Sequence, residues 1–158
     1  MSRSGADLAL LLIGGFRTLV DAAVTELAAR GYDDVRPIHD FAMRAIAAGA
    51  DNASELGRRL SITKQSAART IGVLQERGYV SIEPDPRDAR RKRLQVTELG
   101  FEVLRVGEGI FDDLRAQWAA RIGAGELEAL EKQLAALVGA APVRFDTPGW
   151  MARDLGES

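Results

Sequence analysis

Residues 52–100 constrain the fold of this chain most, because two short helical patterns and a tight turn lead directly into a hairpin rich in arginine. Asn52 begins the first pattern, with Glu55 three positions later in the spacing of a capping box. Leu56 and Leu60 lie about one turn apart, on the face that would point to the core. This segment therefore predicts a short helix that ends in a turn.

A second helix is predicted after the turn formed by Ser61 and Ile62. Thr63 can cap its first turn, and Gly78 marks its end. Its inward face has apolar residues at helical spacing, namely Ala67, Ile71 and Leu74. The opposite face is left for a partner, as in a helix-turn-helix motif.

The next segment predicts a two-stranded hairpin, or wing. Residues 79–84 and 92–97 have the pattern of strands, and Pro84 and Pro86 keep the loop between them out of a helix. Asp85 and Asp88 lie among the arginines of this loop. We expect the two carboxylates to orient neighbouring guanidinium groups by bidentate pairing.

Positive charge is concentrated in this part of the chain. Residues 58–93 contain 10 Lys or Arg and 4 Asp or Glu, which gives +6, whereas the rest of the chain contains 11 basic and 19 acidic residues, which gives −8. Local positive charge is what phosphate binding requires, so the pattern indicates a nucleic-acid-binding surface. A solvated charged face is the alternative interpretation.

Helical patterns flank the motif on both sides. Two helices are expected before it, one ending near Gly31 and one over about 37–48, and two after it, the first starting at Glu98. Gly107 and Gly109 predict a bend or a close helix contact in that helix. The outermost helices have leucine-rich apolar stripes: Leu8, Leu11, Leu12, Gly15, Leu19 and Ala22 in the first, and Leu127, Leu130, Leu134 and Leu137 in the last.

The predicted fold class is mainly α with a small β wing. We expect four parts: an N-terminal dimerisation helix (1–36), a winged helix-turn-helix domain (37–100), C-terminal dimerisation helices (101–141), and a tail (142–158) with Phe145 and Trp150 as its largest apolar side chains. We expect a homodimer held by helices from both ends of the chain.

Composition argues against catalysis. The chain has no cysteine and a single histidine, His39, so thiolate and multi-histidine metal sites are excluded, and no catalytic residue, metal or cofactor is expected. We predict a protein that is not an enzyme. The apolar run from Leu8 to Phe16 is too short to span a bilayer, so no membrane partner is expected and the predicted location is cytoplasmic.

The chain resembles the MarR family of winged-helix transcriptional regulators over nearly its whole length. The resemblance lies in Ser54-Glu55-Leu56, in SITKQSAARTIGVLQERGYV, and in DPRDARRKRLQVTELG with its pattern Asp85-x-Arg87-Asp88-x-Arg90. It implies an obligate homodimer on pseudo-palindromic DNA that represses transcription until an effector releases it. Without cysteine, that effector must act without thiols. Gly57 and Ser61 depart from the family pattern, where alanine and glycine are usual, and are expected to loosen the motif.

The candidate DNA-binding residues come from the second motif helix and from the wing. Those expected in the major groove are Thr63, Lys64, Gln65, Ser66, Arg69 and Thr70. Those expected at the minor groove or near phosphate are Arg87, Asp88, Arg90 and Arg91. Gln65 suits an adenine edge, and Arg69 suits a guanine edge or a phosphate.

The resemblance also implies a ligand pocket between the dimer helices and the DNA-binding lobe. Its candidate lining is Phe16, Arg17, His39, Met43, Phe111 and Trp118, for most of which core packing is the alternative role. A different function stays open as well. The same winged helix could be a protein-interaction module whose basic wing binds an acidic partner protein.

Overall fold

The computed structural model describes residues 3–139 of the 158-residue chain. Six helices and one hairpin follow one another in these residues: α1 (Gly5–Ala29), α2 (Pro37–Ala47), α3 (Ala53–Leu60), α4 (Lys64–Glu76), β1 (Val80–Asp85), β2 (Asp88–Val96), α5 (Glu98–Ile122) and α6 (Ala124–Val138). The strands form a two-stranded antiparallel sheet. The expected fold class, mainly α with a small β wing, is confirmed. Phe145 and Trp150 of the tail lie outside the described residues.

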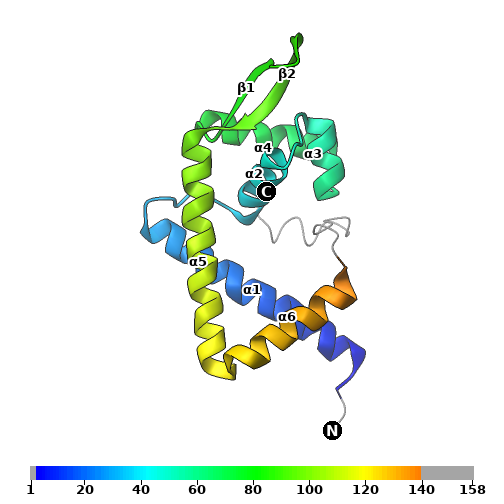
Figure 1. Ribbon diagram of the computed structural model, residues 1–158, viewed down its shortest axis with the longest axis vertical. Coiled ribbons are helices and arrows are strands. Elements are labelled where there is room, and N and C mark those ends of the chain that lie inside the picture. Colours follow the sequence, from blue (N-terminus) through cyan, green and yellow to red (C-terminus); the bar gives the residue numbers. More distant parts are fainter. Residues whose placement is uncertain (1–2, 140–158) are drawn as a thin grey trace.

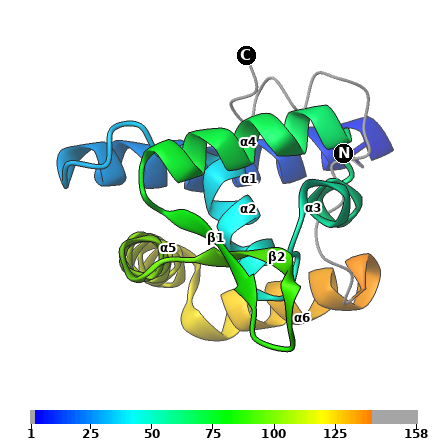
Figure 2. The same cartoon turned by 90° about the horizontal axis from the view of Figure 1, so that it is seen from above.

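The long helix α5 connects two ends of the molecule (Figure 1). The helix-turn-helix elements and the hairpin lie at one end, α6 lies at the other, and α1 crosses α5 between them. An exposed ion pair links α5 to α6, with Arg115 Nε 2.6 Å from Glu131 Oε1. Viewed from above, α4 runs along one side of the upper end, α3 sits beside its N-terminal end, and the hairpin projects from the other side (Figure 2).

A single hydrophobic core joins α1 through α5 and the hairpin. Its largest fully buried side chains are Met43, Leu56, Leu74, Val103 and Ile110. The start of α5 packs closely on the hairpin, because a Cβ on Gly100 would lie 2.1 Å from the backbone oxygen of Tyr79. The core therefore fixes the position of α4 and of the hairpin relative to α5.

The face of α1 that packs within the chain differs from the predicted leucine stripe. Val20, Ala23 and Leu27 are buried, whereas Leu8 and Leu11 are more than half exposed. The spacing of Val20, Ala23 and Leu27 is as regular as that of the leucines, so periodicity alone does not tell the two faces apart. One face of α1 thus joins the core and another stays uncovered in the single chain.

In α5 the two glycines expected to cause a bend or a close contact behave differently. The helix is continuous, and Gly107 makes the close contact, since a Cβ there would lie 3.4 Å from Asp40 Oδ1 on α2. A Cβ on Gly109 would meet nothing within 4 Å among the described residues. Arg44 strengthens the contact, with Nε 2.7 Å from Asp40 Oδ2 and Nη1 3.5 Å from Glu108 Oε1.

By length and composition alone, α1 could cross a membrane, and it is the single helix of residues 3–139 that passes this test. The expectation drawn from Leu8–Phe16 considered too short a segment, because the apolar helix continues to Ala29. Val20, Ala23 and Leu27 are buried against the rest of the chain, but only 11% of the most apolar stretch of the helix is buried. The absence of a membrane partner stays a prediction.

Candidate nucleic-acid interface

The turn between α3 and α4 is set by the backbone. Ser61 adopts the left-handed conformation (φ 52°, ψ 41°), and the N–H of Ile62 donates to the backbone oxygen of Gly57 at 3.0 Å. A Cβ on Gly57 would lie 2.9 Å from the backbone oxygen of Ile62. The expectation that Gly57 loosens the motif is therefore wrong, because its missing side chain is what allows this close approach.

Two N-caps define the starts of the motif helices. The side chain of Asn52 accepts from the Glu55 N–H at 2.9 Å, and that of Thr63 accepts from the Ser66 N–H at 3.0 Å. A capping box would also need the Glu55 side chain to accept from the Asn52 N–H, and the described residues show no such hydrogen bond. Glu55 instead directs its carboxylate at two arginines.

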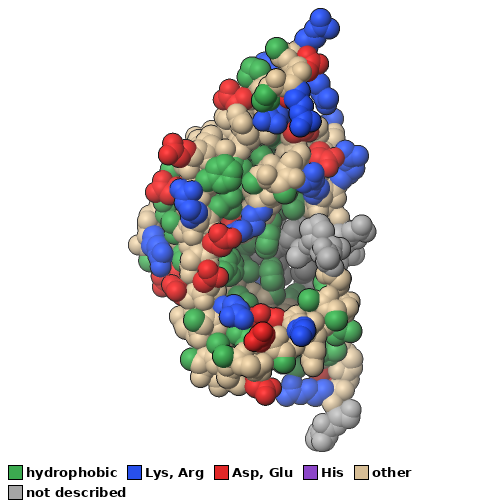
Figure 3. All heavy atoms as spheres, in the orientation of Figure 1, with side chains coloured by type: hydrophobic (Ala, Val, Ile, Leu, Met, Phe, Trp, Pro, Cys, Tyr) green, Lys and Arg blue, Asp and Glu red, His purple; other side chains and the backbone are tan. Residues whose placement is uncertain are grey.

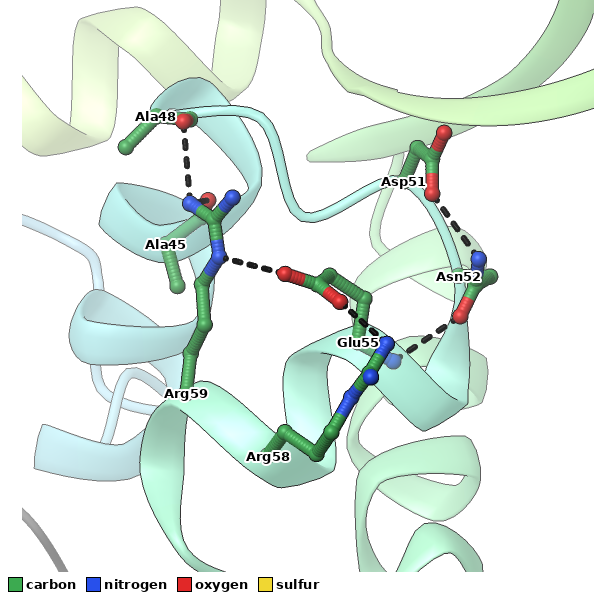
Figure 4. A network of polar contacts seen from close by, with 7 residues as sticks. All are labelled: Ala45, Ala48, Asp51, Asn52, Glu55, Arg58 and Arg59. Carbon is green, nitrogen blue, oxygen red and sulfur yellow. Dashed lines mark hydrogen bonds and ion pairs between the residues drawn. The ribbon is translucent and has the colours of Figure 1, made fainter.

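One of these arginines, Arg59, attaches α3 to α2 (Figure 4). Glu55 accepts from Arg58 and, at 3.1 Å, from Arg59 Nε. The other end of the Arg59 guanidinium donates to the backbone oxygen of Ala48 at 2.9 Å and to that of Ala45 at 3.4 Å, which caps the last turn of α2. The hydrogen bond from Arg59, together with the charge of Arg58, lowers the pKa of Glu55. The first motif helix is thus held at a defined angle to α2.

Of the residues at the start of α4 that we expect in the major groove, some are exposed and some are buried. Lys64, Gln65 and Arg69 are exposed on α4, together with Thr63 at its cap. Ser66 and Thr70 are only 9% and 7% exposed, so their side chains face the core. The expectation that they contact bases in the major groove is therefore wrong. The buried face of α4 thus contains these two polar residues in addition to the apolar stripe of Ala67, Ile71 and Leu74.

Arg69 is partly ordered by a neighbour. Its Nη2 lies 3.3 Å from the hydroxyl of Ser66, one turn earlier. Ser66 therefore supports an exposed arginine instead of facing a partner itself. Ala68, which the sequence analysis did not include, is exposed on the same helix and leaves room for close approach.

The wing has a tighter tip than the sequence predicts. The strands extend to Asp85 and Asp88, so the turn contains only Pro86 and Arg87. The register changes between Pro84, which pairs with Lys92, and Asp85, which pairs with Asp88. Ala89, Arg90 and Arg91 consequently have no partner on β1, as in a bulge.

The two aspartates of the wing bind backbone amides. Asp85 Oδ1 accepts from the Arg87 N–H at 2.9 Å, and Asp88 Oδ1 accepts from the Arg90 N–H at 3.0 Å. Within residues 3–139 neither carboxylate lies within 4.0 Å of a guanidinium nitrogen. The expectation that Asp85 and Asp88 pair with arginine side chains is therefore wrong. A short side chain reaches an amide two residues on more readily than it reaches a guanidinium. The tip arginines stay exposed, and Figure 3 shows basic side chains gathered on the wing.

The C-terminal end of α4 is anchored by contacts that the sequence analysis missed. Arg77 Nε lies 2.8 Å from Asp34 Oδ2, and Arg77 Nη1 donates to the backbone oxygen of Asp34 at 2.6 Å. Arg77 Nη1 also lies 3.3 Å from His39 Nδ1, which accepts from the Arg36 N–H at 3.1 Å and so caps α2. Arg77 therefore anchors the motif helix and adds little to the basic surface.

His39 is buried in this cluster. Burial lowers its pKa to about 4, and the positive charges of Arg77 and Arg36 act in the same direction. The neutral ring is the form that accepts the two N–H groups. Among the residues that the structure describes, no group of three or more His, Cys, Asp or Glu could hold a metal ion.

The structure does not gather the six candidate pocket residues around one cavity. A cavity of about 20 Å³ lies between α1, α2 and α5, and Phe111 is the only one of the six that lines it. Met43 is fully buried in the core, and Trp118 lies against α1, where its Cζ/Cη edge would be 3.5 Å from a Cβ on Gly15. The cavity is too small for a drug-sized molecule.

These elements define a winged helix-turn-helix protein. Residues 41–91 match the model of the MarR family. The resemblance inferred from the sequence is confirmed by this match and by the fold, which is that of the MarR-type winged-helix regulators. No curated protein sequence matches the chain.

Solved structures share this fold at low sequence identity. RV1404 from Mycobacterium tuberculosis is 17% identical with a TM-score of 0.70, over 90% of this chain and 98% of that one. Apo MarR from E. coli is 19% identical with a TM-score of 0.67, over 88% and 100%. A mutant of MepR from S. aureus bound to an oligodeoxyribonucleotide is 15% identical with a TM-score of 0.58, over 87% and 97%.

Proposed function

We propose that this chain is a sequence-specific DNA-binding transcriptional regulator that acts as a homodimeric repressor. The observation that carries the proposal is the presence of two basic surfaces at one end of the molecule: the exposed N-terminal part of α4 with Lys64, Gln65 and Arg69, and the wing with Arg87 and Arg90. A helix and a neighbouring hairpin of this kind can enter a major groove and the adjacent minor groove.

The motif has the rigidity that groove recognition needs. Thr63 caps α4 at its start, and Arg77 ties its end to Asp34. Arg59 holds α3 against α2. In the MepR neighbour that carries an oligodeoxyribonucleotide, the same fold is bound to DNA, which supports the same use here. We assign residues 37–100 to DNA binding on these grounds.

The dimer is proposed from the uncovered apolar surface. Leu10 on α1 and Leu137 on α6 are 66% and 84% exposed, and Leu8, Leu11 and Leu130 are also exposed. Leucines at this density mark an interaction surface more often than open solvent. We propose that a second copy covers them, with residues 1–36 and 101–141 as dimerisation segments. Two recognition helices related by a two-fold axis would read half-sites about 10 base pairs apart.

A small non-thiol effector is proposed to release the DNA. The cavity between α1, α2 and α5 is the candidate place, and it would have to open to accept a molecule, since it measures about 20 Å³. A structure of MepR bound to ethidium bromide, with the same fold at a TM-score of 0.58, supports effector binding in proteins of this shape. A regulator of this kind acts in the cytoplasm, where the DNA is.

Titration of the protein with its own promoter DNA at several salt concentrations tests the proposal. We expect binding that weakens with salt and prefers the promoter over random duplex of equal length. Sedimentation should show a dimer at micromolar concentration. Equal, weak binding to both duplexes would reject the repressor, and capture of an acidic protein through the wing would then favour the protein-interaction module.

A further inference from the structure

The single histidine of the chain, His39, lies buried in the first turn of α2. Its Nδ1 has two N–H neighbours: the backbone N–H of Arg36 at 3.1 Å and Nη1 of Arg77 at 3.3 Å. An amide N–H and a guanidinium can donate hydrogen bonds but cannot accept them. Nδ1 therefore accepts from both neighbours, and the proton of the neutral ring is on Nε2.

The histidine ring touches the end of α4 through Arg77, which is the C-cap residue of that helix. The guanidinium of Arg77 is held by Asp34, in the loop before α2, and by the ring of His39, 38 residues away in the sequence. We call these three residues the anchor cluster. The angle of a recognition helix decides which of its side chains reach base edges. A change at the anchor cluster would therefore alter how α4 is presented to DNA.

A proton on Nδ1 would break the contacts of the histidine ring. The imidazolium form donates from both nitrogens, so neither N–H neighbour would keep its acceptor. Its charge would lie near the positive charges of Arg77 and Arg36. The carboxylate of Asp34 acts in the opposite direction, but it is already paired with Arg77. Tyr79, at the start of β1, lies close to Asp34 and Arg77 as well, and burial raises its pKa, so its hydroxyl stays neutral.

Protonation of His39 and the closed form of the anchor cluster thus oppose each other. Burial, followed by the charges of Arg77 and Arg36, lowers the pKa of His39 from 6.5 to about 4. When the cluster opens, water reaches the ring and its pKa returns to the ordinary value. At pH 5 the proton therefore shifts the equilibrium toward the open cluster by up to about 30-fold relative to neutral pH.

We propose that His39 is a positioning residue for DNA recognition: its neutral ring holds Arg77 and the end of α4, and acid weakens DNA binding by protonating this ring. The effect on DNA rests on the proposed function, whereas the release of α4 by a proton can be tested without DNA. The proton is then a signal that the chain reads without any cysteine.

The first experiment follows the ring by NMR in the full-length ¹⁵N-labelled protein without DNA, where a single histidine gives a single imidazole signal. Between about pH 7.5 and 5 we expect the amide signals of Gln75 and Gly78, at the end of α4, to move together with the ring signal, and that of Lys64 to stay. His39→Asn keeps an acceptor oxygen near the position of Nδ1 but does not titrate, so its amide signals should not move. Movement that persists in His39→Asn would assign the effect to Asp34 and overturn the role of His39, as would a parent without movement.

The second experiment measures the Kd for promoter DNA at about pH 7.5 and 5 at constant salt, with circular dichroism as the check on folding. Acid adds positive charge to the protein, which by itself strengthens binding to phosphate. We nevertheless expect the parent to lose at least fivefold in affinity at the lower pH. His39→Asn should bind like the parent at pH 7.5 and keep its affinity at pH 5, whereas His39→Leu, without an acceptor, should bind weakly at both. An equal loss in His39→Asn and the parent, or parental binding by His39→Leu, would overturn the positioning role.

A reciprocal measurement separates positioning from simple attraction between charges. If protonation of the ring weakens DNA binding, bound DNA must make the ring harder to protonate, so the charged fraction of His39 at about pH 5 should fall when promoter DNA is added. The negative charge of DNA alone would raise that fraction, and a rise would overturn the proposal. If the protein binds no DNA at all, the proposed function fails, while the first experiment still decides whether His39 holds the end of α4.

Discussion

The backbone oxygen of Ile62 occupies the space into which a side chain on Gly57 would project, since a Cβ there would lie only 2.9 Å away. This contact sets the distance between α3 and the turn that leads into α4. Because the obstructing atom belongs to the backbone, a flexible side chain cannot simply move aside.

Gly57→Ala should therefore destabilise the protein. Overpacking of this kind costs about 1–3 kcal/mol and the better helix propensity of alanine returns about 1 kcal/mol, so we expect a net loss of up to about 2 kcal/mol. Gly109→Ala is the control, because it lies in α5 with nothing within 4 Å of the added Cβ among the described residues, and it should stabilise by up to about 1 kcal/mol. Urea unfolding measures both. Equal stabilisation by the two variants would show that the contact is loose.

Ser61→Gly should stabilise the turn. Ser61 is the only residue other than glycine with a positive φ among residues 3–139, and the left-handed conformation costs a side-chain-bearing residue about 1–2 kcal/mol. Glycine loses more entropy on folding, which leaves an expected gain of about 0.5–1 kcal/mol. Ser54→Gly, an exposed position inside α3, should instead cost about 0.5 kcal/mol. The prediction fails if both substitutions destabilise alike.

The stability of the protein should fall with acidification between about pH 6.5 and 4 because of His39. The folded state holds the pKa of His39 at about 4, below its ordinary value of 6.5, so in this window the unfolded chain binds the proton and the native chain does not. A shift of this size corresponds to about 3 kcal/mol. His39→Gln removes this titration, so the difference in unfolding free energy between parent and variant should change over the window. Parallel pH profiles of the two proteins would contradict the assignment.

Gln65→Ala and Arg69→Ala should relax sequence preference. Base-edge contacts contribute roughly 1–3 kcal/mol of discrimination each, so the ranking of operator variants should flatten more than the general affinity falls. Gln75→Ala, at an exposed position near the other end of α4, is the matched control and should leave the ranking unchanged. If all three variants rank the operators as the parent does, Gln65 and Arg69 do not contact the bases.

Arg90→Ala should weaken operator binding strongly without affecting folding. Arg90 lies in the bulge of the wing, exposed, with its backbone N–H held by Asp88. Each lost phosphate contact should flatten the slope of log affinity against log salt by about 0.9. Arg121→Ala removes the same charge from the far end of α5 and should leave both affinity and slope unchanged. Parental affinity and slope in Arg90→Ala would remove this side chain from the interface.

Local spacing was enough to predict α4 and the wing, because Thr63, Gly78 and the strand alternation act over a few residues. It did not predict that Ser66 and Thr70 are buried, since a hydroxyl that faces the core looks the same in the sequence as one that faces solvent. The fold class could be predicted for the same reason as α4: helix caps and apolar periodicity are local.

The contacts that anchor the motif were beyond local reasoning. Arg77 and Asp34 are 43 residues apart, and nothing near either residue identifies the other as its partner. Asp88 illustrates a different limit. Its proximity to several arginines suggested an ion pair, but the backbone amide two residues on is closer and needs no ordering of a long side chain.

The uncovered leucines of α1 also matter while the chain is being made. The ribosome completes α1 long before it completes α5, the helix on which α1 packs, and nearly 100 residues separate Ala29 from Ile122. At about 5–20 residues per second this delay is on the order of ten seconds. Throughout that time both faces of the helix are open to other nascent chains or to chaperones. The sequence of α1 must therefore tolerate exposure before it can assemble, and its Arg17, Asp21 and Glu26 supply the charges that favour solubility in the interval.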